Sequence, residues 1–418
     1  MEKKIRNPQV AGQFYPSDPS ELRSLVASLL NEASGETGPG WEIVSLIAPH
    51  AGYVYSGAVA ARGFGLLKKG QFDKVIVISP CHVDYFPFAS IYDGDAYRTP
   101  LGEIRIDKTL CEKIAACSDL VMTGDRGHAT GRGGRGEHSL EVQLPFLQVA
   151  LGEFGLVPIV MGDQSRAVVE ALGKALGSSL KGEKVLIVAS TDLSHFHDQK
   201  RAKELDSVFT ACLSDFDWER IVDSLASGTT EACGGGPAAS ALLASGILGA
   251  EKCTVLQYAT SGDVSGDMTS VVGYASAAVL RRSARDVKTA RESEEGPANE
   301  SVDEAGLDAL DRDFLLSYAR NVLERAFDRK RPEMDIPPSP VLRENRGGFV
   351  TLKKAGQLRG CIGYIEAVMP LVDTVREMAK AAAFSDHRFP QVDRSELDDI
   401  TIEISVLSPI RVIEDPTE

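Results

Sequence analysis

Four of the seven histidines in the chain stand just beyond the ends of apolar runs, and they are His50, His82, His195 and His197. Histidine is the commonest metal ligand in proteins, and its side chain is the best suited to proton transfer near neutral pH. If these runs are strands of one open sheet, the histidines that follow them meet at the edge where such sheets bind ligands. A single histidine of this kind is more often a hydrogen-bonded loop or core residue. The four together indicate a metal or acid–base site.

Cys233 is the strongest candidate for a third ligand beside two of these histidines. A catalytic metal site has three protein ligands and keeps a position open. Cys233 precedes Gly234, Gly235 and Gly236, which let the backbone pass close to a ligand, and then Pro237, which suits the first turn of a helix. The dipole of that helix would favour the thiolate form. The alternative is a small buried cysteine before a tight turn, and most of the other cysteines fit that description better.

Two further loops carry side chains that could line the same cleft. His138 and Glu141 stand three residues apart at the start of an expected helix, so they would share one of its faces. Tyr53 and Tyr55 stand close to His50 and could wall a pocket. The alternatives are a helix cap with a surface pair for the first loop, and ordinary core packing for the two tyrosines.

The elements that must position these residues alternate between apolar runs and helical patterns. Near-continuous runs of Val, Ile and Leu suit strands that are buried on both faces. We expect strands at 43–48, 74–79, 156–161, 184–190, 254–259 and 269–275, and helices at 19–32, 56–68, 107–116, 139–151, 165–179, 199–213 and 237–248. This order predicts an α/β fold in which a mixed or parallel sheet is flanked by helices.

A charged segment from residue 281 to residue 305 is almost free of large apolar side chains and contains a Gly-Pro pair. This composition is typical of a solvated linker, and the alternative is a long surface helix. We therefore expect a first domain at 1–280, a linker at 281–305 and a smaller second domain at 306–418. The second domain shows an α+β pattern, with an expected helix at 309–328, a proline-rich turn at 337–340 and strands near 348–352 and 400–407.

Length and composition exclude several classes of protein. The chain has 418 residues, seven cysteines and a formal net charge of −15. The cysteines form no Cys-X-X-Cys pair, which excludes a zinc knuckle, and their odd number indicates a reducing compartment. Excess negative charge disfavours nucleic acid as a partner. Because we find neither a secretory signal nor the ~20 apolar residues of a membrane helix, we expect a cytoplasmic protein that does not contact a membrane.

Five motifs in the first domain resemble the Memo family, also called AmmeMemoRadiSam system protein B. They are APHAGYVYSG at 48–57, SPCH at 79–82, GEHSLEVQLPFL at 136–147, STDLSHF at 190–196 and ACGGGP at 232–237. Because the motifs are well separated and occur in the family's order, the resemblance is specific and spans roughly residues 5–280. It implies the fold of the class III extradiol ring-cleaving dioxygenases.

The resemblance also implies the residues of the site. It implies metal ligands at His50, His82 and Cys233, with His195 in the position of the dioxygenases' acid–base histidine and Asp192 beside it. Those dioxygenases hold non-haem Fe(II) with two histidines and a carboxylate, which a cysteine would replace here. A soft thiolate favours copper(I) or zinc as well as iron. We therefore expect iron or copper as the cofactor, with zinc as a further option.

The second domain contains QLRGCIG at 357–363, which resembles the LRGCIG motif of the AMMECR family, AmmeMemoRadiSam system protein A. Supporting segments are GGFVTL at 347–352, AFSDHRFP at 383–390 and IEISVLSP at 402–409. Domains of that family normally continue beyond such a segment, so we expect this one to be incomplete at its C-terminus. Both families take their shared name from occurring with a radical S-adenosylmethionine protein, which implies such a protein as a partner.

Five side chains of the second domain could form a polar cleft, and they are Arg359, Cys361, Asp386, His387 and Arg388. The alternative is a tightly packed turn and strand that buries the thiol of Cys361. The residue types alone are compatible with either arrangement.

Three functions remain open from the sequence. The first is a metal-dependent, dioxygenase-like oxidoreductase that acts on an unidentified small molecule while His195 moves protons. The second is a metal-binding or scaffold module without turnover, which the thiolate ligand favours. The third is a hydrolase or transferase in which Cys233 is the nucleophile and a histidine is the base.

Overall fold

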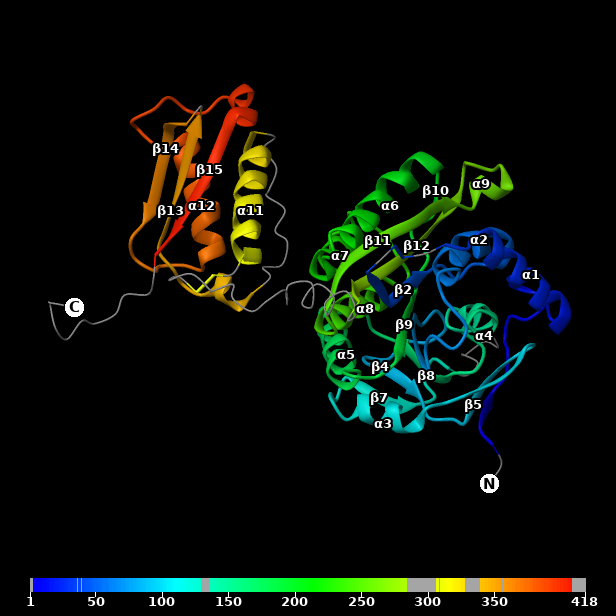
Figure 1. Ribbon diagram of the computed structural model, residues 1–418. Coiled ribbons are helices and arrows are strands. Elements are labelled where there is room, and N and C mark those ends of the chain that lie inside the picture. Colours follow the sequence, from blue (N-terminus) through cyan, green and yellow to red (C-terminus); the bar gives the residue numbers. More distant parts are fainter. Residues whose placement is uncertain are drawn as a thin grey trace. The chain divides into compact units, whose positions relative to one another are not determined.

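The computed structural model describes most of the chain, namely residues 3–35, 37–38, 40–128, 136–283, 306–307, 309–327, 339–354 and 356–407. The chain divides into two compact units, residues 1–294 and 295–418, which are described separately (Figure 1). Arg281 and Arg282, at the start of the expected linker, end a strand of the larger unit. The rest of the expected linker from residue 284 onwards lies outside the described residues.

A nine-stranded mixed sheet forms the centre of the larger unit. Its order is β10-β12-β2-β9-β3-β8-β4-β7, with β11 beside β12. The strands are β2 (Trp41–Ala48), β3 (Lys74–Pro80), β4 (Ala89–Tyr92), β7 (Val121–Gly124), β8 (Gly155–Met161), β9 (Val185–Ser190), β10 (His195–His197), β11 (Ala250–Thr260) and β12 (Val271–Arg282). The four central strands β2, β9, β3 and β8 run parallel, while β12 and β4 run antiparallel to their neighbours β2 and β8. The predicted mixed sheet is confirmed.

Helices cover both faces of this sheet. On one side lie α5 (Arg166–Ser179), α6 (Gln199–Ser214), α7 (Trp218–Ala226) and α8 (Gly235–Ile247), and on the other lie α1 (Pro19–Glu32), α2 (Tyr53–Phe64) and α4 (Leu144–Leu151) (Figure 1). Because both faces are covered, the side chains of β3 and β9 are buried almost throughout, which explains their continuous apolar sequences. Helices α5 and α8 pack closely at Gly173, where a Cβ atom would come within 2.7 Å of the Leu243 side chain.

The predicted helices are found with shifted ends, while several short elements were not predicted. The expected helix at 139–151 is a 3-10 turn at Glu141–Gln143 followed by α4. The elements that the sequence analysis missed are β4, β7, β10, α7, the short helix α9 (Gly262–Ser265) and the three strands of a separate sheet, β1 (Ile5–Arg6), β5 (Ala96–Thr99) and β6 (Gly102–Arg105). Most of these strands have two to four residues, too few for a recognisable apolar period. Helix α3 (Lys108–Ala115) was predicted at 107–116.

The smaller unit is an α+β structure, as predicted. Its antiparallel sheet has the order β14-β13-β15, with β13 (Gly348–Lys354), β14 (Gln357–Tyr364) and β15 (Ile400–Val406). Helices α11 (Ala309–Phe327) and α12 (Leu371–Phe384) share one apolar core with the sheet, and 3-10 turns occur at Pro340–Arg343 and Arg394–Asp399. Helix α12 was not predicted, and a strand at β14 was expected only in the structural alternative for the Cys361 motif. Part of the expected turn at 337–340 and the end of the motif at 402–409 lie outside the described residues.

The described helices include none that is long and apolar enough to cross a membrane.

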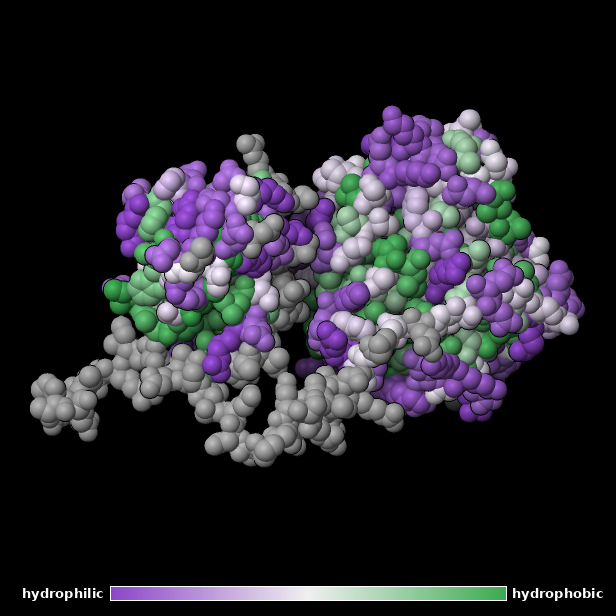
Figure 2. Space-filling view, turned by 45° about the horizontal axis from the view of Figure 1, so that its top comes forward, coloured by the Kyte–Doolittle hydropathy of each residue, from purple (hydrophilic) through white to green (hydrophobic). Residues whose placement is uncertain are grey.

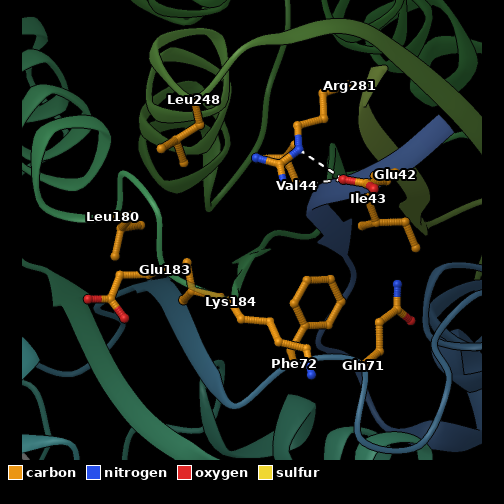
Figure 3. A pocket seen from close by; sticks show the side chains of 11 residues that line it. Glu42, Ile43, Val44, Gln71, Phe72, Leu180, Glu183, Lys184, Leu248 and Arg281 are labelled. Carbon is orange, nitrogen blue, oxygen red and sulfur yellow. Dashed lines mark hydrogen bonds and ion pairs between the residues drawn. The ribbon is translucent and has the colours of Figure 1, made fainter. Parts of the chain in front are cut away.

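A cavity of about 270 Å³ lies at the beginnings of strands β2 and β9 (Figure 3). Its apolar walls include Phe72, Leu180 and Leu248. The charged groups at its rim pair within the protein, since the Arg281 guanidinium lies 3.2 Å from the Glu42 carboxylate. The histidines that follow β2 and β9 lie beyond the opposite ends of these strands, so this cavity is separate from them.

His128 is a buried histidine that we expect to make stability depend on pH. Its Nε2–H donates to Ser90 O at 3.0 Å, so Nδ1 accepts from the Tyr97 hydroxyl at 2.5 Å. Burial lowers the pKa of His128 to about 3. The unfolded chain, with a pKa near 6.5, therefore takes up a proton first as the pH falls. The stabilisation is complete above about pH 6.5 and is lost progressively toward about pH 3.

Lowering the pH from about 7.5 to about 5 should cost the larger unit about 2 kcal/mol through His128 alone. Urea unfolding followed by tryptophan fluorescence measures this, because both tryptophans, Trp41 and Trp218, belong to the larger unit. The His128→Gln variant keeps an amide donor for Ser90 but does not titrate. Its stability should fall about 2 kcal/mol less over the same interval, and equal losses in the two proteins would contradict the assignment.

Candidate metal centre

His50 follows β2 and is held by buried hydrogen bonds. Its backbone N–H donates to Asp192 Oδ1 at 2.7 Å, and its Nδ1 lies 2.8 Å from Ser190 Oγ. The Ser190 hydroxyl donates to Ser139 O at 2.6 Å, so the Ser190 oxygen accepts from Nδ1–H of His50. The lone pair of His50 is therefore on Nε2, which lies 3.1 Å from Cys233 Sγ. Burial lowers the pKa of His50 well below its ordinary value, and the neighbouring His82 and His138 act in the same direction.

His82 follows β3 and is oriented by the buried carboxylate of Glu137. Its Nδ1 lies 3.1 Å from Glu137 Oε1, and its backbone N–H donates to Glu137 Oε2 at 2.5 Å. Burial would lower the pKa of His82, but the hydrogen bond and the charge of Glu137 raise it above the ordinary value. With Nδ1–H committed to Glu137, Nε2 carries the lone pair that a metal ion would use.

Cys233 lies just before α8 and is fixed by two backbone contacts with Asp192. The Cys233 N–H donates to Asp192 O at 3.2 Å, and the Asp192 N–H donates to Cys233 Sγ at 3.3 Å. The next residue must be glycine, because a Cβ atom at Gly234 would come within 2.1 Å of Ser190 O. Burial raises the pKa of the Cys233 thiol, and the charge of Asp192 raises it further. The metal-free thiol is therefore protonated, and binding of a cation would release its proton.

The structure brings His50, His82 and Cys233 together. Each offers one donor atom, and these atoms lie within 4.8 Å of one another. Nitrogen and sulfur ligands that share a tetrahedral ion stand about 3.5 Å apart, so the 3.1 Å contact between His50 and Cys233 needs only a small adjustment. The two imidazoles have their free lone pairs on Nε2, and the thiol becomes a soft anionic ligand. The residues present therefore fit a metal ion.

Glu137 should control metal affinity without binding the metal itself. Its carboxylate accepts hydrogen bonds from His82, from the backbone of His138 and from both the backbone and the hydroxyl of Ser139. These contacts and the two histidines hold the pKa of Glu137 below its ordinary value despite burial. A Glu137→Gln variant should bind metal about 10–100-fold more weakly, because the amide carries no negative charge. Its NH2 group would also face the N–H and O–H groups that now donate to the carboxylate.

Competition with a chromophoric chelator measures the change in metal affinity caused by Glu137→Gln. Glu231→Gln is a matched control, because Glu231 also pairs with a histidine, His197 at 2.9 Å, but is half exposed. Equal affinities of the Glu137→Gln protein and the parent would contradict the role of Glu137.

His195 and Asp192 lie at the same edge of the sheet. His195 begins β10, and its imidazole interacts electrostatically with that of His82. Burial lowers the pKa of His195 below its ordinary value. Asp192 is buried against His50 and Cys233, and burial raises its pKa to about 7 despite the hydrogen bond from the His50 backbone. A carboxyl group with this pKa can gain or lose a proton near neutral pH.

The structure places the other loop residues of the sequence analysis either at the candidate metal centre or in the core. His138 lies at the centre, with ring-centroid distances of 5.5 Å from His50 and 4.9 Å from His82. Glu141 does not line the cleft, because its carboxylate is fully buried and binds Arg6. The Tyr53 hydroxyl donates to a core carbonyl. Tyr55 is exposed at the start of α2. On the face of the larger unit that Figure 2 shows, apolar and hydrophilic side chains are mixed.

The predicted polar cleft of the smaller unit is an internally paired cluster. The Asp386 carboxylate accepts from the Cys361 N–H at 2.8 Å and from Arg388 Nη2 at 2.8 Å. Hydrogen bonds from Arg388 and from the Cys361 backbone lower the pKa of Asp386. Arg359 pairs separately with Glu396 at 2.8 Å, and His387 is exposed. These contacts tie β14 to the segment after α12, which favours the packed strand of the structural alternative, whereas Cys361 is only partly buried.

The fold and the site define a mixed α/β protein with a candidate metal centre at one edge of its sheet. The chain belongs to the Memo family, because the family model described as Memo-like protein matches residues 6–278. The AMMECR1 family model matches residues 316–418. Both resemblances drawn from the motifs are confirmed.

Several archaeal relatives cover the larger unit. A MEMO1 family protein of Methanothermobacter thermautotrophicus is 36% identical over 282 residues, which are 65% of this chain and 99% of the relative. One of Methanosarcina acetivorans is 37% identical over 275 residues, 65% of this chain and 98% of the relative. The crystal structure of an uncharacterized protein from Pyrococcus horikoshii also matches, with 35% sequence identity and a TM-score of 0.23. The match covers 26% of this chain and 57% of that protein.

Proposed function

We propose that this chain binds one iron or copper ion through His50, His82 and Cys233, and that it acts as a metal-dependent oxidoreductase. The observation that carries the proposal is the convergence of the three donor atoms within 4.8 Å. Buried acceptors hold both imidazoles in the tautomer that frees Nε2. The thiolate favours iron, copper(I) or zinc over hard cations. When bound, iron or copper would supply one-electron chemistry and open coordination positions.

The chain's own residues would manage protons around that ion. His195 is the proposed acid–base residue, since its imidazole interacts electrostatically with that of His82, and burial lowers its pKa so that it stays neutral near pH 7. Asp192 has a pKa of about 7, and it accepts hydrogen bonds from the backbone N–H groups of His50 and Cys233, so it can exchange a proton while positioning both proposed ligands. The substrate would be a small molecule that reaches the edge of the sheet.

Metal analysis of the anaerobically purified protein, combined with oxygen uptake in the presence of ascorbate, tests this function. We expect about one equivalent of iron or copper per chain and measurable oxygen consumption. His195→Gln should keep the metal and lower oxygen consumption about 100-fold, as for other general acid–base residues. A metal-free protein would overturn the proposal. A full metal content without oxygen consumption, with ascorbate or with candidate substrates, would favour the binding or scaffold module.

One contact favours a second candidate, a cysteine hydrolase or transferase. Cys233 Sγ lies 3.1 Å from His50 Nε2, and the His50 ring is oriented by Ser190, as in a nucleophile and base pair. Burial raises the pKa of the Cys233 thiol, which opposes this function. Iodoacetamide alkylation of the metal-free protein at several pH values separates the two. Rapid modification of Cys233 below pH 7 would support the nucleophile.

We further propose a cytoplasmic location and a radical S-adenosylmethionine protein as the partner, without nucleic-acid or membrane partners. The net charge of −15 and the scattered cysteines support the location and the exclusion of nucleic acid. The presence of both the Memo and the AMMECR1 family matches in one chain supports the partner, by association alone. Co-purification of the two proteins expressed together under anaerobic conditions tests the partner.

A further inference from the structure

Three imidazole rings form a nearly equilateral triangle at the candidate metal centre. The ring centroids of His50 and His82 are 5.3 Å apart, and that of His138 lies 5.5 Å from His50 and 4.9 Å from His82. The His138 ring stacks on that of His82 and contacts the Phe14 ring at 4.8 Å. The third imidazole is thus placed beside the ligands by packing on two rings.

His138 does not belong to the set of metal ligands. Among the described residues its donor atoms group with those of His82 and Glu137, and not with those of His50 and Cys233. The Glu137 carboxylate is occupied by N–H and O–H donors, so it has little capacity for a cation. This second group is therefore not a second metal site, and His138 stands next to the first.

The ring nitrogens of His138 make no hydrogen bond with the described residues, whereas His50 and His82 each have Nδ1 held by a hydrogen bond. Ser190 holds Nδ1 of His50, and Glu137 holds Nδ1 of His82. Within the described part of the chain, neither ring nitrogen of His138 makes a hydrogen bond, and its Nδ1 lies 3.6 Å from Glu137 Oε1. The side chain is 22% exposed, so a small molecule can reach it.

We propose that His138 donates a hydrogen bond to the small molecule that exchanges at the metal centre. The acceptor would be a negatively charged oxygen or nitrogen atom of that molecule. The inference rests on the proposed function, since it requires a bound metal ion. Glu137 and Asp192 make the surroundings of the centre acidic, so an anionic ligand needs a donor beside the ion. His138 is the imidazole of this cluster that is free to supply one, and it would select for anionic ligands.

Cobalt(II) loading followed by an azide titration tests the role of His138. The full chain is loaded with cobalt(II), which gives visible absorption bands that change when azide binds. The parent and the His138→Ala, His138→Gln and His138→Phe variants are compared. Phe14→Leu is the matched control, because it removes a ring that packs on His138 but keeps the imidazole. Cobalt content and circular dichroism are measured for each protein.

We expect every variant to bind about one equivalent of cobalt, and the dissociation constant for azide to rise about tenfold in His138→Ala and His138→Phe. That change corresponds to about 1.4 kcal/mol. The amide of His138→Gln should restore affinity to within about threefold, and Phe14→Leu should change it less than about twofold. An unchanged azide affinity in folded Ala and Phe variants would overturn the inference, as would loss of cobalt, which would make His138 a ligand. Failure of the parent to bind cobalt would instead overturn the proposed function.

Discussion

The Cys233→Ser variant should retain less than about a tenth of the metal found in the parent protein. The thiolate is the anionic ligand of the proposed set, and serine cannot replace it, because its hydroxyl does not ionise at neutral pH. The two remaining imidazoles would hold the ion too weakly to survive purification. Metal content by mass spectrometry after anaerobic gel filtration measures the loss, and circular dichroism verifies that the variant is folded.

Cys81→Ser is the control that shows whether the loss of metal is specific to Cys233. Cys81 directly precedes His82 and is partly buried, as Cys233 is. It is nevertheless not among the described residues whose donor atoms converge with those of His50 and His82. The Cys81→Ser protein should therefore keep its full metal content. Metal retained in Cys233→Ser but lost in Cys81→Ser would place the ion on the other sulfur and contradict the assigned ligands.

The residues of the candidate metal centre could be predicted from the sequence because each adjoins an element with a strong local signal. Long apolar runs end directly before His50 and His82, and strands that run parallel in one sheet place their last residues at one edge. Cys233 is followed by three glycines. The structure shows why Gly234 must lack a side chain, since it lies against the backbone of Ser190. In these places the order of strands along the chain determines which side chains meet.

The residue that orients His82, Glu137, could not be predicted, because it comes from a segment without such a signal. Glu137 contacts His82, which lies 55 residues earlier in the chain. The loop that carries Glu137 has no hydrophobic periodicity from which its position could be predicted. Spacing favoured Glu141 and His138 as a pair on one helical face. The chain instead forms a 3-10 turn there, and this turn directs Glu141 into the core. Short strands such as β5 were missed because their pairing partners, not their composition, define them.

Replacing Arg6 with leucine should lower the free energy of unfolding of the larger unit by about 3–5 kcal/mol, because it leaves a buried carboxylate without its cation. The Arg6 guanidinium binds the carboxylate of Glu141, and both side chains are almost wholly buried. It also donates to the carbonyls of Glu137 and His128, so it ties strand β1 to the loop that carries the metal-centre residues. Urea unfolding followed by tryptophan fluorescence measures the loss, as for His128.

Arg98→Ala is the matched control for this ion pair. Arg98 also pairs with a glutamate, Glu103 at 2.6 Å, but both side chains are substantially exposed, so its loss should cost less than about 1 kcal/mol. The double variant Arg6→Leu/Glu141→Gln should be more stable than Arg6→Leu alone, because the neutral amide no longer needs a cation in the core. Its amide oxygen can still accept from the Val10 N–H and the Tyr15 hydroxyl. A cost below about 1 kcal/mol for Arg6→Leu, or no recovery in the double variant, would show that the pair is not what holds the N-terminal strand to the loop.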